Sequence, residues 1–578
     1  MQFRRLDWLL AFALVAATFL AYQPVWRGLP IWDDGQLMAN AELASLHGLA
    51  RIWFELGATL HYFPLLYTAF WLQGELWRGS TLGHHLVSIA CHAASALLVL
   101  VILRRLRVKG AWLAASVFAL HPVNVESVAW ISELKNTMSG LFYLSATLVY
   151  LKFDDTRKRS WFILAAGLFL CGLLSKTTVV VWPLAMMVIL WWKRGVLTWK
   201  RDVLPLVPLL ALAVVEGWMT IHVERGYMGA PGAELQLTLV HRFLIAGRVC
   251  WFYLGKLLWP LDLCPIYPRW QINSVALTDY LYPTGILVLL FLLWALRNRS
   301  RAPLAAMLFF VGTLSPVLGM ISFSYFWYSF VADHYQYLAG LGILAMLAAS
   351  GTRFQETSGR LPRPIGISLC LVLLAVLAGM TWRYSRTFTD LETFARTTLA
   401  RNPDAWIAHD HLGVVFTSQG KLSEAIDQYR LALQGNPQYP MGHFNLGCAL
   451  ASAGRIEEAV QQYDQALQLQ PNFTRAHYNL GCALASQGRF PEAIEHYQQA
   501  LRLKPGTPEI HNNLGVALAA SGKIEEAVEH FREALRLKPD FAEAQRNLEL
   551  ALNAGKKIGK TQAGQSDETS GVERPPIP

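Results

Sequence analysis

Apolar residues dominate the chain from about residue 8 to about residue 382 and become much less frequent after that point. In the first part they form runs close to the roughly 20 apolar residues that a helix needs to cross the hydrocarbon layer of a membrane. The second part has the polar content of a soluble domain. The pattern therefore predicts an all-α chain in which a polytopic membrane domain is followed by a soluble one.

The apolar runs predict about eleven membrane spans. With the N-terminus in the cytoplasm, every short Lys and Arg cluster between the runs falls inside, as the positive-inside rule describes. This topology places the soluble part outside the cytoplasm. The predicted spans are 8–23, 84–103, 111–130, 137–152, 161–175, 177–192, 203–220, 280–296, 303–322, 335–351 and 365–382.

Two further apolar stretches, 62–77 and 243–259, do not fit this alternation. Making either of them a span moves later arginine clusters to the outer side. Both are rich in aromatic residues, which suits the level of the membrane interface. We expect both to be helices that lie in the outer interface. The first run, which follows Arg4 and Arg5, is expected to be a retained helix rather than a cleaved signal peptide.

Composition agrees with a membrane protein, because 54% of the residues are apolar and only 16% are charged. Soluble domains carry about a quarter charged residues. The net charge of +10 lies in the short clusters between apolar runs, so it does not indicate a nucleic-acid partner. The seven cysteines show no metal-ligand spacing, and no metal site is predicted.

The soluble part repeats itself with a period of 34 residues. Helix pairs with small residues at their contact, ended by proline, are typical of tetratricopeptide repeats. We expect a membrane domain over 1–383, a connecting half-repeat over 384–405, a repeat solenoid over 406–554 and a disordered tail over 555–578. The recurring positions are Leu412-Gly413, Leu446-Gly447, Leu480-Gly481 and Leu514-Gly515; Ala425, Ala459, Ala493 and Ala527; and Pro437, Pro471, Pro505 and Pro539.

One repeat position carries asparagine on the first helix of each successive pair. Stacking of the repeats would align these side chains on the concave surface. A carboxamide both donates and accepts hydrogen bonds, so the row is suited to binding a peptide backbone. The alternative is that asparagine only satisfies local hydrogen bonds there. The row consists of Asn445, Asn479, Asn513 and Asn547, with His411 in the slot of the first repeat.

The predicted outer loops carry most of the candidate chemistry. The first loop contains Asp33 and Asp34, the second runs from His121 through Glu126 to Lys135, and a late loop contains Asp333 and Tyr337. Ionisable residues at the edges of spans are costly and so indicate function. Taken singly, each has a structural alternative: a turn for Asp33 and Asp34, an ion pair for Glu126, an interfacial position for Lys176 and an anchor for Arg248.

The most specific features of the chain are the two aspartates, the block His121–Trp130, the turn Leu174–Lys176 and the order of the two domains. In these features it resembles bacterial relatives of the TMTC-type protein O-mannosyltransferases. Two places depart from the wording of that family, namely Ile131–Asn136 and His334, which stands where an arginine is expected. The resemblance implies a membrane domain of the GT-C type in a bacterial cytoplasmic membrane.

The resemblance also implies a reaction. A hydroxyl of an exported protein attacks a sugar on a polyprenyl-phosphate carrier at the outer membrane face, with no cofactor and no metal. Asp33, or Asp34 next to it, is implied as the general base. Cations stabilise the leaving phosphate, with Lys176 first and then Arg248 and Lys135. Glu126 and His121 orient the sugar or phosphate, and Asp333 and Tyr337 shape the cavity.

Two alternatives stay open. The chain could be a membrane-anchored repeat scaffold for assembling envelope proteins, with an inactive membrane domain. It could also be an enzyme whose acceptor is a lipid or a glycan. The acidic loop favours an enzyme over a scaffold, and the asparagine row favours a polypeptide acceptor.

Overall fold

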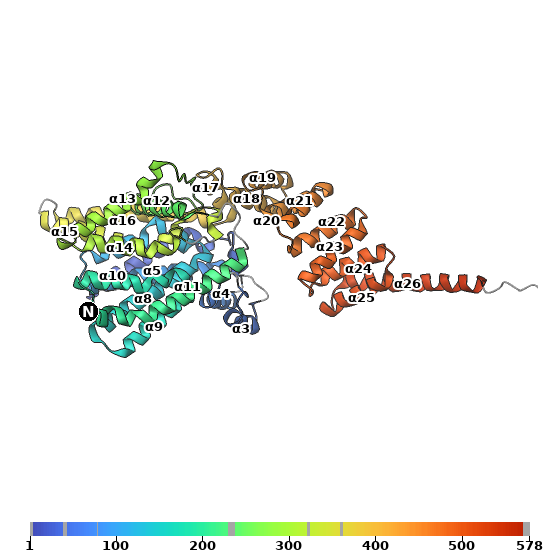
Figure 1. The fold of residues 1–578 in the computed structure, drawn as a ribbon, viewed down its shortest axis with the longest axis horizontal. Helices are drawn as coiled ribbons and strands as arrows, with labels where there is room; N and C mark the ends of the chain where they lie inside the picture. The colour runs from blue at the N-terminus through green and yellow to red at the C-terminus, as the bar shows by residue number, and fades with distance from the viewer. Residues whose placement is uncertain are drawn as a thin grey trace, which may run out of the picture. The chain divides into compact units, whose positions relative to one another are not determined.

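The computed structural model describes residues 4–38, 43–59, 61–77, 79–228, 237–320, 324–358 and 362–569. Throughout these residues the regular secondary structure is helical, with no strand, which confirms the all-α part of the predicted fold class. The chain divides into two compact units, Met1–Ala405 and Trp406–Pro578 (Figure 1).

Within the described residues of the first unit, four helical segments are long and apolar enough to cross a membrane, and they indicate membrane association. All four coincide with predicted spans, but the total of about eleven spans is not confirmed. The segments are Thr81–Arg105 (α5), Trp199–Val223 (η6 to α11), Leu277–Asn298 (α13 and η9) and Arg363–Phe388 (α16 and η13).

The expectation of one continuous helix over 111–130 is wrong. Helix α6 (Ala111–Leu120) ends before His121, whose backbone is extended, and short helical turns follow. Pro122 causes the break, because proline disfavours the helical conformation of the residue before it and has no backbone N–H to donate. The turns are η3 (Pro122–Asn124), α7 (Val125–Ala129) and η4 (Ile131–Glu133).

Two other predicted spans are interrupted near their start, where each has a 3₁₀ turn before its α-helix. Turn η5 (Thr177–Val181) precedes α10 (Trp182–Arg194), and turn η12 (Asp333–Gln336) lies shortly before α15 (Gly340–Ser358). These breaks place polar residues at helix ends rather than inside apolar helices. The two predicted interfacial stretches are helices α4 (Pro64–Trp77) and α12 (Leu239–Leu258), and their place in the interface stays a prediction.

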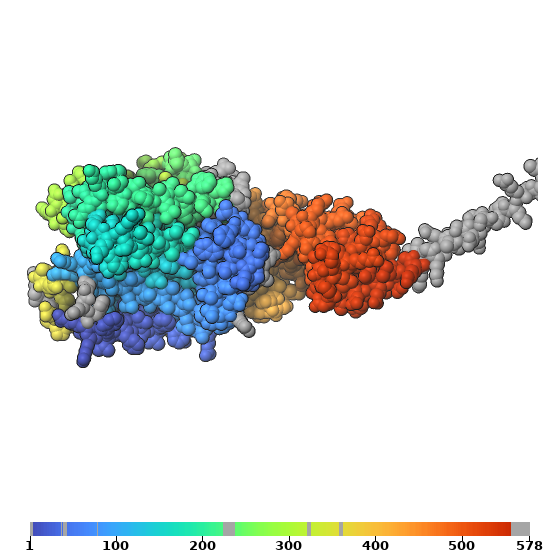
Figure 2. Space-filling view, turned by 90° about the horizontal axis from the view of Figure 1, so that it is seen from below, coloured from blue at the N-terminus to red at the C-terminus, as the bar shows by residue number. Residues whose placement is uncertain are grey.

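Helix α8 (Leu134–Thr156) is central in the first unit, since it packs against both α5 and α9 (Arg159–Leu173). On the face shown in Figure 2, dark blue N-terminal residues form one edge of this unit, and green residues from the middle of the chain form the opposite edge. The unit's other main helices are α1 (Arg5–Ala21), α2 (Asp34–Met38), α3 (Leu46–Phe54), α14 (Ala302–Leu314) and α17 (Leu391–Leu399).

The first unit exposes many large apolar side chains along its outer helices. In α16, for example, Ile365, Ile367, Leu369, Leu371 and Val372 are each at least half exposed. A soluble protein rarely leaves such contiguous apolar surface in water. This surface agrees with the membrane association that the four candidate spans indicate.

The second unit consists of helix pairs whose first helices begin at 406, 440, 474 and 508, at the predicted spacing of 34 residues. Each pair closes over a glycine: a Cβ at Gly447 would lie 2.6 Å from the ring of Tyr463. The pairs are α18 (Trp406–Ser418) with α19 (Leu422–Gly435), α20 (Pro440–Ser452) with α21 (Ile456–Leu469), α22 (Thr474–Ser486) with α23 (Phe490–Leu503), and α24 (Pro508–Ala520) with α25 (Ile524–Leu537).

A final helix, α26 (Ala542–Thr569), packs on α25 and continues beyond Gly555, where the sequence predicts the start of a disordered tail. The segment contains Ala, Lys and Gln, which favour helix even without tertiary contacts. The rest of the predicted tail, residues 570–578, lies outside the described residues.

Candidate functional site

The loop that carries the two aspartates is held by a strained residue. Trp32 has φ of 43°, a left-handed conformation that is unfavourable for a bulky side chain. Its ring stacks on Trp130 at 5.5 Å between centroids and meets Tyr328 edge-on at 5.1 Å. Strain of this kind persists only where the surroundings fix it, and it marks this turn as a candidate functional position.

Asp34 has a structural role, because its side chain joins two segments of the backbone. It is 1% exposed and accepts backbone N–H bonds from Ile31 at 2.9 Å and from Ser132 at 2.7 Å. These bonds tie the first loop to the turn η4. Burial, and then the charge of Asp33, raise the pKa of Asp34 well above its usual range, although the two N–H groups oppose this.

Asp33 differs from its neighbour. Its side chain is half-buried, and among the described residues its Oδ1 atom has no hydrogen-bond partner. Burial raises the pKa of Asp33, and the Lys135 ammonium acts against that shift. A carboxylate with a free oxygen and a raised pKa has the properties of a general base.

Glu133 organises two lysines next to Asp33. Its Oε1 atom lies 2.7 Å from Lys135 Nζ, and its Oε2 atom lies 3.8 Å from Lys176 Nζ. Asn136 donates to Glu133 and accepts from Lys176, so it bridges the pair. Glu133 is 2% exposed. Since Glu133 ends η4, Lys135 lies in the first turn of α8 and Lys176 follows α9, the ends of these three elements converge on one charged cluster.

The protonation states follow from this packing. Burial would raise the pKa of Glu133, but His334, Lys135 and Lys176 outweigh it and lower the pKa to about 2. Burial lowers the pKa of Lys176 to about 8, although Glu133 acts to raise it. For Lys135 the carboxylates of Glu133 and Asp33 outweigh burial and raise the pKa. At neutral pH the cluster therefore contains two ammonium groups.

A second buried acidic group adjoins this cluster. Glu126 accepts from the His334 backbone N–H at 3.1 Å and lies 2.8 Å from its Nδ1 atom. Asp333 accepts from the Tyr267 hydroxyl at 3.0 Å. Burial, and then the charge of Glu126, raise the pKa of Asp333 well above its usual range. The Glu126 carboxylate also acts on Lys176, which links the two groups electrostatically.

Three other predicted site residues make separate contacts. His121 Nε2 donates to Leu257 O at 3.2 Å. The Tyr337 hydroxyl lies 2.9 Å from His92 Nδ1 in a buried pair. The Arg248 guanidinium lies 4.6 Å from the ring centre of Trp270. The structure therefore brings Asp33, Lys135 and Lys176 together, with Glu126 and Asp333 adjoining, whereas His121, Tyr337 and Arg248 are engaged elsewhere.

Sequence reasoning did not assign roles to Glu133, Asn136 and His61. The pairing of Glu133 with Lys135 could have been found from their spacing alone, but Lys176 joins them only in three dimensions. Burial, and then the charges of Lys135 and Lys176, lower the pKa of His61 to about 4, so its ring is neutral. The described residues contain no group of three or more His, Cys, Asp or Glu side chains arranged to hold a metal ion.

In the second unit the asparagine row bonds from one repeat to the preceding one. Each asparagine is half-buried and uses its Nδ2 atom for this contact. For Asn445 and Asn479 no protein group within the described part of the chain donates to the carbonyl oxygen, which is therefore able to accept from a ligand. The contacts are Asn445 to Asp410 at 3.0 Å, Asn479 to Cys448 at 3.2 Å, Asn513 to Tyr478 at 3.0 Å and Asn547 to Asn512 at 2.9 Å.

The fold and the two candidate sites define an all-helical, membrane-associated protein with a repeat solenoid. Family models described as "Tetratricopeptide repeat" match residues 444–508, 480–542 and 512–556, and one described as "TPR repeat" matches 413–452. The predicted repeats are therefore confirmed.

Curated relatives support the predicted resemblance to the TMTC-type proteins. A protein O-mannosyl-transferase of Caenorhabditis elegans is 27% identical over 64% of this chain and 53% of its own length. The protein O-mannosyl-transferase Tmtc1 of Drosophila melanogaster is 28% identical over 28% of this chain and 21% of its own length. The chain thus spans about half of the nematode relative and less of the insect one.

Among solved structures, MamA is 25% identical over 27% of this chain and 94% of its own length, with a TM-score of 0.26. The structure of YrrB, described as "a TPR protein with an unusual peptide-binding site", is 23% identical over 34% of this chain and 94% of its own length, also with a TM-score of 0.26. These scores are too low to support any argument about arrangement or binding.

Proposed function

We propose that this chain is a glycosyltransferase of the GT-C type. It would move a sugar, mannose or a similar one, from a polyprenyl-phosphate carrier to a hydroxyl of an exported protein at the outer membrane face. The relatives named protein O-mannosyl-transferases support the reaction class. The observation that carries the proposal is the cluster around Glu133, in which one buried carboxylate pairs with both Lys135 and Lys176 and the Lys135 ammonium also acts on the Asp33 carboxyl.

The cluster supplies the groups that this reaction needs. Asp33 accepts the proton of the acceptor hydroxyl, whose oxygen forms a bond to the anomeric carbon as the bond from that carbon to the phosphate oxygen breaks. The lipid phosphate leaves with the electron pair of that bond. Lys135 and Lys176 stabilise the charge that develops on it, because fixed cations in a site shielded from water act strongly. Asp34 positions Asp33 by holding the loop.

Glu133 keeps two neighbouring cations compatible with burial. Two ammonium groups in one buried site repel each other, and a carboxylate between them offsets the cost. A donor phosphate brings its own negative charge to the two lysines. We therefore assign Glu133 to positioning Lys135 and Lys176, and the group of Glu126, His334 and Asp333 to shaping the adjoining wall.

The second unit would hold the acceptor. In this proposal the asparagine row binds an extended polypeptide, and the carbonyl oxygens of Asn445 and Asn479 accept its backbone N–H bonds, which gives binding that tolerates many sequences. It requires the topology predicted from the basic clusters, with the N-terminus in the cytoplasm and the repeats outside. A reporter fused after Pro539 should then be active only outside the cytoplasm, and activity inside would separate the repeats from the proposed site.

Donor binding tests the proposal directly. The full-length protein in lipid nanodiscs should bind polyprenyl-phosphate mannose, and Lys176→Gln should weaken that binding on the order of tenfold or more, the value of one charge-assisted contact. Lys200→Gln, an exposed lysine of the same charge, is the matched control. A wild-type protein that binds no donor would favour the repeat scaffold, and equal binding by the Lys176→Gln and Lys200→Gln variants would remove Lys176 from the site.

A further inference from the structure

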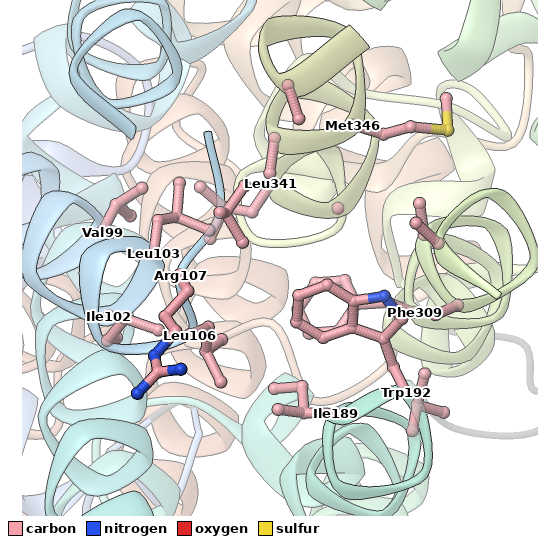
Figure 3. A pocket seen from close by; sticks show the side chains of 18 of the residues that line it. Val99, Ile102, Leu103, Leu106, Arg107, Ile189, Trp192, Phe309, Leu341 and Met346 are labelled. Atoms are coloured by element: carbon pink, nitrogen blue, oxygen red, sulfur yellow. The ribbon is translucent and has the colours of Figure 1, made fainter. Parts of the chain in front are cut away.

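A cavity of about 250 Å³ opens in the first unit between the ends of α5, α10, α14 and α15, with α8 behind it. Most of its wall is apolar. Figure 3 shows Leu103, Trp192 and Leu341 lying around a common space from three different helices, with Arg107 beside them. The volume is just below the roughly 300 to 1,000 Å³ of sites for whole small ligands. It suits one end of an apolar chain.

Arg107 occupies a backbone position that normally favours glycine. It follows the end of α5 with φ of 57°, while Val108 N–H bonds to Leu103 O at 2.8 Å and Arg107 N–H bonds to Arg104 O at 3.0 Å. This is a Schellman ending, in which the left-handed residue is usually glycine. An arginine retained there in spite of the strain points to a use for its side chain.

The neighbouring charges make Arg107 stand out further. Several basic residues at this end of the helices are paired with carboxylates. Within the described part of the chain, Arg107 and Arg353, both at the cavity, have no carboxylate in an ion pair with them. Arg157 has a similar left-handed backbone, with φ of 55°, but its guanidinium bonds to Asp154 at 2.6 Å. The paired residues are Arg104 with Asp7, Arg105 with Asp155, Lys109 with Glu356, and Arg194 with Asp154 and Asp202.

The cavity is separate from the candidate catalytic site. Lys176 lies just before η5 and α10, whereas Trp192 and the cavity lie near the far end of α10. The 13 residues of α10 alone span about 20 Å at 1.5 Å per residue. In the proposed topology this far end is the cytoplasmic one, where the membrane leaflet carries anionic lipids.

We propose that this cavity binds one anionic phospholipid, with an acyl chain between Leu103, Trp192 and Leu341 and the headgroup phosphate between Arg107 and Arg353. The apolar wall selects an acyl chain, and each methylene that enters strengthens binding roughly fourfold. The two arginines without carboxylate partners select a negative headgroup. Each arginine contributes about fivefold near a membrane surface. The proposal does not depend on the glycosyltransferase assignment.

Native mass spectrometry of the full-length protein in detergent tests this, with dioleoyl phosphatidylglycerol, dioleoyl phosphatidylcholine and undecaprenyl phosphate offered separately. We expect one retained phosphatidylglycerol per chain and a preference of at least about fivefold over phosphatidylcholine. Arg107→Gln with Arg353→Gln should reduce retention more than tenfold. Arg159→Gln, at an exposed arginine outside the cavity, should leave it unchanged.

Two further variants separate binding from folding. Arg107→Gly relieves the backbone and should keep or raise the melting temperature while retention of phosphatidylglycerol falls. Ala345→Phe narrows the cavity and should lower retention of the lipid irrespective of its headgroup. Equal retention of both phospholipids, unchanged retention in Arg107→Gly, or retention of undecaprenyl phosphate in place of phosphatidylglycerol would each overturn the proposal.

Discussion

Replacing Glu133 by glutamine removes the one negative charge that the two site lysines share. Glu133 Oε2 lies 3.8 Å from Lys176 Nζ, and both side chains are less than one-tenth exposed. At an effective dielectric constant near 20, this pair interacts by about 4 kcal/mol. Losing that energy would lower the pH at which Lys176 gives up its proton by on the order of 3 pH units. This is an upper value, because water enters a site that has lost an ion pair.

The direction of the effect on activity follows from both titrating groups. Lys176 acts as a cation, so its contribution is present below its pKa of about 8 and is lost as pH rises through that value. Glu133 raises that pKa, so its loss moves the alkaline limb of the activity profile to lower pH. Asp33 acts as a base above its own raised pKa, and the charge of Glu133 contributes to raising it. The acid limb should therefore move to lower pH as well.

The assay is the pH dependence of sugar transfer by the reconstituted protein, measured for the wild type, Glu133→Gln and Glu133→Asp. We expect the whole bell-shaped profile of Glu133→Gln to shift to lower pH by more than about one unit. Glu133→Asp keeps the charge and should keep the wild-type limbs with a lower maximum. A Glu133→Gln profile with unshifted limbs, or with limbs at higher pH, would refute the assigned roles of Lys176 and Asp33.

Three further predictions concern stability. Asp34→Ala leaves the buried N–H groups of Ile31 and Ser132 unsatisfied and should lower the free energy of unfolding by about 2 to 4 kcal/mol, measured by thermal unfolding. Asp33→Ala should not destabilise the protein. Equal losses of stability in the two variants would contradict the distinction between the two aspartates. Burial raises the pKa of Asp410 from 3.8 to about 6, so the wild-type repeats should lose about 2 kcal/mol as pH rises from 4 to 7. Asp410→Asn should match the wild type at pH 4 and exceed it at pH 7 in urea unfolding of the repeat unit, and a difference independent of pH would argue against this. Gly447→Ala pushes a methyl against the Tyr463 ring and should cost about 1 to 3 kcal/mol in the same assay, so a neutral result would contradict the packing.

The repeats could be predicted well from the sequence because their contacts are local and periodic. Gly447 and Tyr463 are only 16 positions apart, and each repeat contacts mainly its neighbours, so the 34-residue spacing contains most of the structural information. The membrane unit was harder. Apolar content locates helices, but it does not show where a helix breaks, and Pro122 divided a run that composition treats as continuous.

The candidate site shows the same limit at the level of single residues. Asp33 and Asp34 are adjacent in the sequence, and the family resemblance ranks Asp33 only narrowly ahead of Asp34 as the base. Only the fold shows that Asp34 accepts two backbone N–H bonds, while Asp33 Oδ1 has no hydrogen-bond partner among the described residues. Lys176 reaches Glu133 across 43 positions of the sequence, and no local pattern encodes that contact.

Single-turnover transfer by the Asp33→Asn variant tests the central claim most directly. The substrates are polyprenyl-phosphate mannose and a Ser/Thr-containing acceptor peptide, with the full-length protein in nanodiscs and donor binding measured in parallel. We predict that Asp33→Asn binds donor as the wild type does but transfers sugar on the order of 100-fold to 10,000-fold more slowly, the usual contribution of a general base. Transfer at the wild-type rate by Asp33→Asn would contradict the account.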